Sequence, residues 1–135
     1  MFTVAREFSF SYGHRLYRYE GKCRRLHGHN GRARVEVAAE GGALDEMGMA
    51  LDFARMKETL GRWIDEELDH RVFLAKDDPL VSALAELGDP PVVVDGNPTA
   101  EAFAEMIFNF ARRAGLNVVR VDFWETEKCR ATYRP

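Results

Sequence analysis

The sequence predicts an α+β protein in which two helices pack on one face of a four-stranded antiparallel sheet. Two segments with alternating apolar side chains come first, two segments with helical spacing follow, and two further alternating segments end the sequence. This ββααββ order is typical of proteins whose helices cover one side of an antiparallel sheet. With 135 residues, 46% of them hydrophobic, residues 1–135 are expected to form a single domain with its own core.

The first two alternating segments form one half of the predicted sheet. Residues 2–10 place apolar side chains on one face and polar side chains on the other, as in a half-buried strand. A turn-rich basic segment follows, so His14 is expected beyond the end of this strand. From His29 onward the alternation resumes, and a second strand is predicted to run as far as the Glu-Gly-Gly turn at residues 40–42.

Two segments have apolar side chains at helical spacing. The first runs from Phe53 to Leu68 after a short extended piece at residues 49–51, and Asp52 before it is a suitable N-cap. The second follows Thr99, which is again a suitable N-cap. It should end at Gly115, because glycine readily adopts the left-handed conformation that terminates helices.

The remaining segments are short. Residues 76–91 are rich in prolines and acids and are expected to be a loop region around a short helix, followed by an extended piece at residues 92–94. Residues 119–123 and 129–133 alternate and form the last two predicted strands. Cys129 falls on the apolar face of the final strand, where we expect it to pack.

Composition and charge limit the classes of function. No stretch approaches the roughly 20 apolar residues of a membrane span, and no secretory signal follows Met1, so we expect a cytoplasmic protein with no membrane partner. The net charge is −3, but residues 14–34 carry seven basic residues against one acid, which leaves −9 for the rest. Because long nucleic acids would be repelled outside this patch, the asymmetry favours a small phosphorylated ligand and no nucleic acid. A solvated basic loop is the alternative.

Three of the four histidines lie within sixteen positions, around one cysteine. His27 and His29 leave the same face of an extended backbone, and an antiparallel return of the chain would bring His14 beside them. Three neutral imidazoles on Zn²⁺ leave one position open, which is the pattern of catalytic zinc. Two alternatives stay open: exposed loop histidines, or a closed structural site completed by Cys23.

Three further features suggest chemistry. Cys23 lies between Lys22 and Arg24, whose positive charge favours the thiolate of a general base or nucleophile. Asp69-His70 ends the first helix, although adjacent residues seldom bond side chain to side chain and the helix dipole alone would favour a histidine there.

Glu125 shares the parity of Phe123, so its carboxylate lies on the face expected to be buried and needs a partner. A ligand with two adjacent N–H donors, such as a guanine-like or pterin ring, would satisfy it with two parallel hydrogen bonds. The alternatives are an internal salt bridge to an arginine and a position at the exposed end of the strand.

Six segments together resemble the 6-pyruvoyl-tetrahydropterin synthase and 6-carboxytetrahydropterin synthase family over nearly the whole sequence: FSFSYGHRL, GKCRRLHGHN, GMALDF, LDH, NPTAE and ETEKCRATY. The resemblance implies a tunnelling fold (T-fold), in which three subunits close a twelve-stranded barrel. It further implies that two such trimers stack into a homohexamer, with active sites between subunits.

The resemblance also implies three groups of site residues. The zinc ligands are His14, His27 and His29. The catalytic residues are the proton acceptor Cys23, the relay residues Asp69 and His70, and Glu125. The pterin ring is held by Glu125, with Thr99 and Glu101 assisting across a subunit boundary.

The spacing of Cys23 four residues before His27 resembles the bacterial 6-carboxytetrahydropterin synthases, because the animal enzymes have a longer gap. The activity implied is that of a zinc-dependent lyase. It converts 7,8-dihydroneopterin triphosphate to 6-carboxy-5,6,7,8-tetrahydropterin, acetaldehyde and triphosphate, on the queuosine and deazapurine route. The basic segment could hold the triphosphate, with no arginine singled out. Alternatives are a 6-pyruvoyl-tetrahydropterin synthase, which eliminates triphosphate, and a non-enzymatic zinc-stabilised binding module. The sequence departs from the commoner family pattern at Tyr12-Gly13 and in an acidic insert near residues 77–89.

Overall fold

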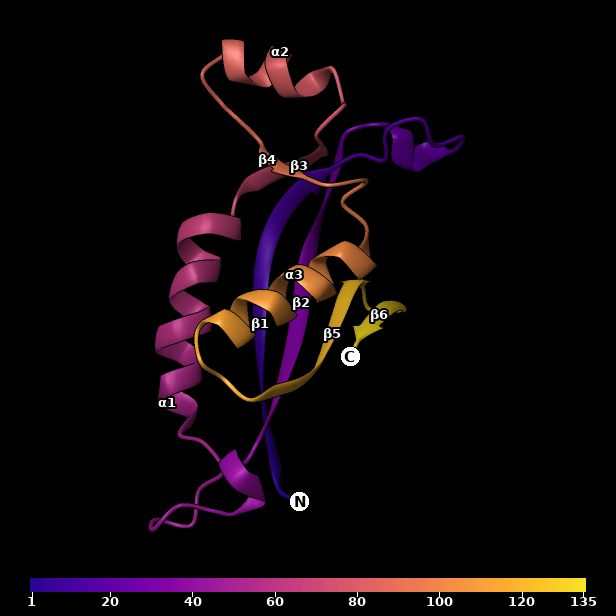
Figure 1. Cartoon of the computed structure of the whole chain (residues 1–135). Coiled ribbons are helices and arrows are strands. Elements are labelled where there is room, and N and C mark those ends of the chain that lie inside the picture. Colours follow the sequence, from indigo (N-terminus) through magenta and orange to yellow (C-terminus); the bar gives the residue numbers. More distant parts are fainter.

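The computed structural model describes residues 1–135 and contains one six-stranded sheet in the order β4-β3-β1-β2-β5-β6 (Figure 1). The predicted α+β class is confirmed, but the predicted number of four strands is wrong. The strands are β1 (Thr3–His14), β2 (His27–Ala38), β3 (Arg71–Ala75), β4 (Val92–Val94), β5 (Val118–Thr126) and β6 (Cys129–Tyr133).

The two additional strands are β3 and β4, and they make the sheet mixed. β3 pairs in parallel with the end of β1, and β4 pairs in parallel with β3. Parallel partners are joined by long crossovers rather than tight hairpins, so no local turn signal marks them in the sequence. The run Phe73–Ala75 is buried without alternation, as is typical of strands covered on both faces.

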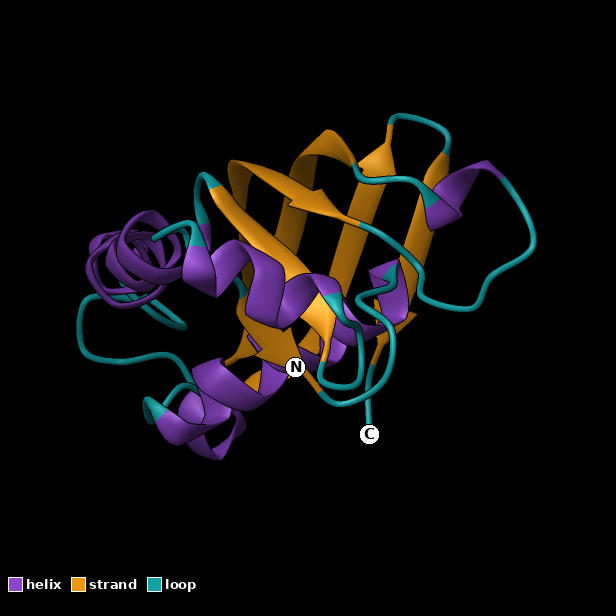
Figure 2. Cartoon of the chain, turned by 90° about the horizontal axis from the view of Figure 1, so that it is seen from above, coloured by secondary structure: helices purple, strands orange, loops and turns teal.

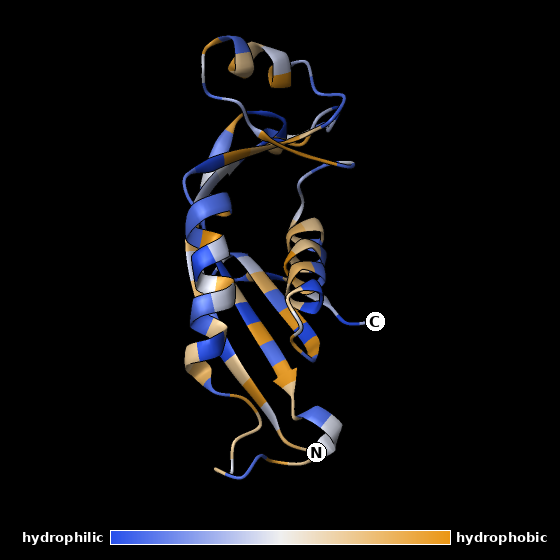
Figure 3. Ribbon diagram, turned by 60° about the vertical axis from the view of Figure 1, so that its left-hand side comes forward, coloured by the Kyte–Doolittle hydropathy of each residue, from blue (hydrophilic) through white to orange (hydrophobic).

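The two long strands extend further than the alternation predicted. All of β1 pairs with all of β2 in a single antiparallel register. His14 is therefore the last residue of β1, directly opposite His27, and not a residue beyond the strand. Phe10, Tyr12 and His14 are buried at every second position, because alternate side chains face the core. Figure 3 shows the same alternation as blue and orange bands along the strands.

Two helices cover one face of the curved sheet (Figure 2). The first begins with α1 (Phe53–Met56) and continues through two π-helical turns, Lys57–Gly61 and Ile64–Leu68. Asp52 caps it by accepting the Ala54 amide hydrogen at 2.8 Å. The buried stripe is Met56, Leu60, Ile64 and Leu68, whereas Phe53, expected in this stripe, is about half exposed.

The second helix is α3 (Ala100–Arg113). Thr99 caps it by accepting the Ala102 amide hydrogen at 3.2 Å, and Gly115 follows it with a left-handed φ of 83°. Phe103 and Ile107 of this helix share one core with the buried stripe of the first helix and with β1, β2 and β5. The core therefore lies between the helices and one face of the sheet.

Two local predictions are wrong. Residues 49–51 are not extended, because the Asp45 carboxylate accepts the amide hydrogens of Met47 and Met49 and closes a turn there. Cys129 is exposed and not packed. It has the apolar parity, but it lies at the start of β6 opposite Thr126, where the register of the β5–β6 pair shifts.

The predicted loop region holds a short helix, α2 (Leu80–Glu86), above the β3–β4 edge in Figure 1. Two single turns complete the structure: η1 (Lys22–Arg24) and η2 (Glu40–Gly42). None of the helices has the length and apolarity needed to cross a membrane.

Candidate metal centre

The three histidines predicted as metal ligands meet at the end of the β1–β2 pair. His14 is opposite His27 and Tyr12 is opposite His29, so the three imidazoles leave the same face of two paired strands. The Nε2 atoms of His14 and His27 are 3.1 Å apart. One ring nitrogen from each of the three residues lies within 4.8 Å of the others, so the histidines are not dispersed over a loop.

Backbone carbonyls orient two of the rings. Nδ1 of His14 lies 2.7 Å from the Pro98 carbonyl oxygen, and Nδ1 of His27 lies 2.6 Å from that of Arg25. Because a carbonyl can only accept, each Nδ1 carries the proton and each Nε2 presents a lone pair. Two lone pairs facing each other at 3.1 Å repel unless a cation lies between them.

This donor set fits a tetrahedral metal ion. Ligand nitrogens about 2.0–2.1 Å from zinc are about 3.3–3.4 Å from one another, close to the 3.1 Å between the Nε2 atoms of His14 and His27. Carbonyl bonds to the outer ring nitrogens are the usual way in which proteins orient metal-binding histidines. The residues present could therefore hold such an ion with three nitrogen ligands.

Burial favours the neutral form of His14 and of His29, which is the form that binds metals. Desolvation lowers the pKa of His14 from 6.5 to about 4, although the bond to the Pro98 carbonyl acts in the opposite direction. His27 and His29 lower it further through charge repulsion. Desolvation likewise lowers the pKa of His29.

Glu125 lies beside this cluster, on the face of the sheet where the parity of β5 placed it. Its Oε1 is 3.8 Å from Nε2 of His14, and its side chain is 25% exposed. Its negative charge partly offsets the lowered pKa of His29. No arginine forms an ion pair with Glu125, so the carboxylate keeps acceptor capacity for a ligand.

A pocket of about 250 Å³ adjoins Glu125. Its lining comes from the start of α3, from β5 and β6 and from the loop after β1: Leu16, Thr99, Ala100, Glu101, Glu125, Cys129, Arg130 and Ala131. It therefore brings together the three residues that the family resemblance implies for ring binding. The Thr99 oxygen accepts the Ala102 amide hydrogen, which leaves its hydroxyl proton free to be donated.

Asp69 and His70 form a separate group between the first helix and β3. Asp69 accepts hydrogen bonds from the Ser11 amide at 2.9 Å and from Nδ1 of His70 at 2.8 Å. The Ser11 amide, and then His70, hold the pKa of Asp69 below its usual range. The two adjacent side chains do bond here, and His70 has a left-handed φ of 61°.

Neither His70 nor Cys23 is joined to the histidine cluster within one chain. The His70 side chain is 80% exposed, and its only hydrogen-bond partner is Asp69. Cys23 is exposed in η1 and is not among the gathered ligand atoms. The alternative of a closed site with Cys23 as fourth ligand is therefore not supported by this arrangement.

Two residues beside the cluster, Tyr12 and Pro98, were not predicted from the sequence as part of the site. The Tyr12 ring packs edge-on against His14, with centroids 5.2 Å apart, and its hydroxyl is buried without a hydrogen-bond partner. Burial, and then the charge of Glu125, raise the pKa of Tyr12. Its shared parity with Phe10 and His14 was a usable signal, whereas nothing in the sequence marks the Pro98 carbonyl.

Comparisons with known proteins agree with this geometry. The family model described as 6-pyruvoyl tetrahydropterin synthase matches residues 3–135. A 6-carboxy-5,6,7,8-tetrahydropterin synthase of Rickettsia conorii is 35% identical over 111 residues, covering 81% of this chain and 79% of the relative.

Two solved structures extend the likeness to the fold. An uncharacterized protein of Wolinella succinogenes superposes with a TM-score of 0.79 at 31% identity, covering 98% of this chain and 97% of its own. The 6-pyruvoyl tetrahydropterin synthase of Caenorhabditis elegans gives a TM-score of 0.72 at 26% identity, covering 99% and 95%. The fold is thus the T-fold, and the chain belongs to the 6-pyruvoyl tetrahydropterin synthase family of pterin-synthesising enzymes, on its bacterial 6-carboxy branch.

Proposed function

We propose that this chain is a zinc-dependent 6-carboxytetrahydropterin synthase. It would convert 7,8-dihydroneopterin triphosphate to 6-carboxy-5,6,7,8-tetrahydropterin, acetaldehyde and triphosphate, a step towards queuosine. The observation that carries the proposal is the convergence of His14, His27 and His29 beside Glu125. Support for the carboxy product comes from the Rickettsia relative, which bears that name.

The metal centre and the adjoining pocket have complementary tasks. Zinc, when bound, supplies Lewis acidity towards the hydroxyl oxygens of the substrate side chain. Glu125 accepts two parallel hydrogen bonds from the pterin ring, which fixes the distance between the ring and the histidines. Thr99 and Glu101 line the same pocket and would complete the binding of the ring.

Cys23 and His70 are the proposed proton carriers. Cys23 takes a carbon-bound proton as a thiolate, and His70 returns or relays one. Asp69 supports this role, because its bond to Nδ1 of His70 leaves Nε2 free to face a substrate. As both residues are exposed and apart from the histidines, neighbouring subunits would have to complete the site.

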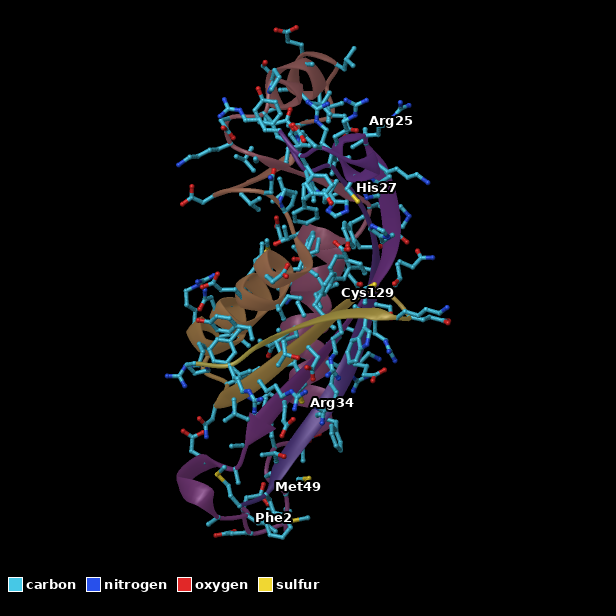
Figure 4. All side chains as sticks on the ribbon, turned by 90° about the vertical axis from the view of Figure 1, so that its right-hand side faces the viewer. Phe2, Arg25, His27, Arg34, Met49 and Cys129 are labelled. Carbon is cyan, nitrogen blue, oxygen red and sulfur yellow. The ribbon has the colours of Figure 1, made fainter.

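A homohexamer, built as two stacked trimers, is therefore part of the proposal. β4 and β6 end the sheet on unpaired edges, which could join the sheets of neighbouring copies. Exposed apolar side chains gather near the N-terminus, where Figure 4 shows Phe2 and Met49 side by side at one end of the molecule. Such surfaces are typical of contacts between proteins.

The Cys23→Ala variant tests whether Cys23 is catalytic. The zinc content of the variant distinguishes a catalytic cysteine from a structural zinc ligand. We expect zinc to stay bound while turnover of the triphosphate substrate disappears. Cys129→Ala is the matched control for zinc content, because it removes the other exposed thiol; it is not a control for turnover, since Cys129 lines the pocket beside Glu125. Loss of zinc and unfolding of Cys23→Ala would instead support the zinc-stabilised binding module.

Product analysis separates the two reactions of the family. The solved structure from Caenorhabditis elegans keeps the 6-pyruvoyl alternative open, because it superposes over nearly the whole chain. Mass spectrometry after incubation with 7,8-dihydroneopterin triphosphate should detect acetaldehyde and the 6-carboxy product. A 6-pyruvoyl product without acetaldehyde would contradict the proposal.

A further inference from the structure

The loop between β1 and β2 lines a wide, open hollow of basic character that the proposed chemistry does not use. Its volume is about 740 Å³, larger than that of the pocket beside Glu125. Four of its eight lining residues are arginines and none is acidic: Arg15, Leu16, Tyr17, Arg18, Tyr19, Arg24, Arg25 and Leu26. The hollow is thus suited to an anion of high charge.

Three of the four guanidinium groups are available to a ligand. Arg15 is already paired with Asp78, with Nε 2.7 Å from Oδ2, and Asp78 is 2% exposed. Arg18, Arg24 and Arg25 form no ion pair with any acid of the chain. They offer three positive charges in one place, which would repel one another without a counter-charge.

The hollow is held in shape from outside the loop. Asn97 accepts the Tyr17 amide hydrogen at 2.8 Å and donates to the Tyr17 carbonyl at 3.2 Å. Asp78, from the acidic insert, fixes Arg15. Arg18 has a left-handed φ of 66°, uncommon for a residue with a side chain and frequent where a loop is shaped for a ligand.

The hollow is also next to the metal centre. Arg15 follows His14 directly, and Arg25 offers its carbonyl oxygen to Nδ1 of His27. Figure 4 shows Arg25 and His27 close together at the same end of the molecule. A ligand whose carbon chain reaches the three imidazoles could therefore place a charged tail among these arginines.

We infer that this hollow is the subsite for the triphosphate tail, with Arg18, Arg24 and Arg25 as its charge-bearing residues and Asp78 and Asn97 as its supports. The inference rests on the proposed function, since it assumes a pterin triphosphate at the metal centre. Three linked phosphoryl groups carry about four negative charges near neutral pH, most of which the three free guanidinium groups would neutralise. Arginine also binds phosphate oxygens in a bidentate manner.

The experiment compares Arg24→Gln/Arg25→Gln with the control Arg112→Gln/Arg113→Gln, which removes two exposed charges at the end of α3. Inorganic tripolyphosphate is titrated calorimetrically into the zinc-loaded protein, and zinc content is measured afterwards to separate binding from metal stripping. We expect the Kd to rise about tenfold or more in the first variant and to stay unchanged in the control. The Arg25 carbonyl remains, so the orientation of His27 is kept.

Kinetics provide the second readout. The first variant should raise the KM for dihydroneopterin triphosphate about tenfold, while dihydroneopterin without phosphates binds equally to all forms. Arg18→Asn is the second variant if the double variant misfolds, because asparagine tolerates a left-handed backbone. It should give the same loss of tripolyphosphate binding.

The outcomes separate this inference from the proposed function. Unchanged tripolyphosphate binding and unchanged KM in the variants would overturn the subsite and leave the enzyme assignment standing. Arginine-dependent tripolyphosphate binding without turnover in any form would support the anion site and overturn the assignment. If a short RNA binds more tightly than tripolyphosphate, and this binding depends on the arginines, the subsite assignment is overturned, because the hollow would then be a nucleic-acid binding site.

Discussion

The histidine cluster and the Asp69–His70 pair both carry candidate functional side chains, but His14 of the cluster is buried and the His70 side chain is exposed. His14 is 2% exposed and is fixed by strand register and by a carbonyl contact from the start of α3. The His70 side chain is 80% exposed and has only its neighbour Asp69 as a partner. A single chain thus gathers the three proposed metal ligands by itself, whereas the proposed proton relay is exposed on the surface, where another subunit could use it.

The largest expected effect comes from breaking the cluster. His27→Ala removes one of the three proposed nitrogen ligands. We expect zinc affinity to fall more than about 100-fold, because mutating residues that only hydrogen-bond to metal ligands already lowers metal affinity about 10- to 100-fold. Activity should fall to background. Metal analysis after dialysis checks the first effect and a turnover assay the second. Retention of stoichiometric zinc in His27→Ala would show that the ligands lie elsewhere.

The corresponding change in the exposed pair should leave the metal in place. We expect His70→Asn, chosen because asparagine tolerates the left-handed φ of His70, to lower kcat by about 100- to 10,000-fold, the usual contribution of a general acid or base. Zinc content and thermal stability should match the unaltered protein, since the side chain is mostly exposed. A variant with normal kcat would remove His70 from the proposed relay.

Acid should affect the buried region selectively. The pKa of His14 in the folded chain is about 4, below its usual 6.5, so between these values the unfolded chain binds more protons. The free energy of unfolding of the metal-free protein is therefore unaffected by His14 above about pH 6.5. Protonation of His14 in the unfolded chain lowers it towards pH 4, by on the order of 3 kcal/mol. Urea unfolding at stepped pH measures this. His14→Gln should flatten the dependence, and an equal slope in that variant would assign it to other groups.

The smallest expected effect tests the close approach of the strands beneath the cluster. A Cβ at Gly28 would lie 2.9 Å from the Tyr12 carbonyl oxygen, so Gly28→Ala forces two backbones apart. We expect a loss of about 1–3 kcal/mol in the free energy of unfolding, together with weaker zinc binding. Gly13→Ala is the matched control opposite it, because its nearest contact would be the Val72 side chain at 3.4 Å. Equal losses in both variants would contradict this account.

The arginine-lined hollow shows what the distribution of charge along the sequence could predict and what it could not. The sequence indicated a basic segment between His14 and Arg34 and a small anionic ligand. It could not distinguish Arg15, which is occupied by Asp78, from the unpaired arginines, because Asp78 is 63 residues away along the chain. The acidic insert, which had no assigned role, contributes that buried partner.

The sequence by itself determined the features that depend on local periodicity. Alternation fixed the shared face of Phe10 and His14 and of Phe123 and Glu125, and the caps Asp52 and Thr99 marked where the helices begin. These features follow from the geometry of a single segment, so neighbouring residues suffice to reveal them.

Only the tertiary structure decided which segments meet. Three features depend on residues that are distant in the sequence: the parallel pairing of β3 and β4, the Pro98 carbonyl behind His14, and the separation of His70 from the histidine cluster. Backbone carbonyls and strand edges are present in every residue type, so composition does not mark the ones that will be used. Their positions follow from how the helices and the sheet pack around one core.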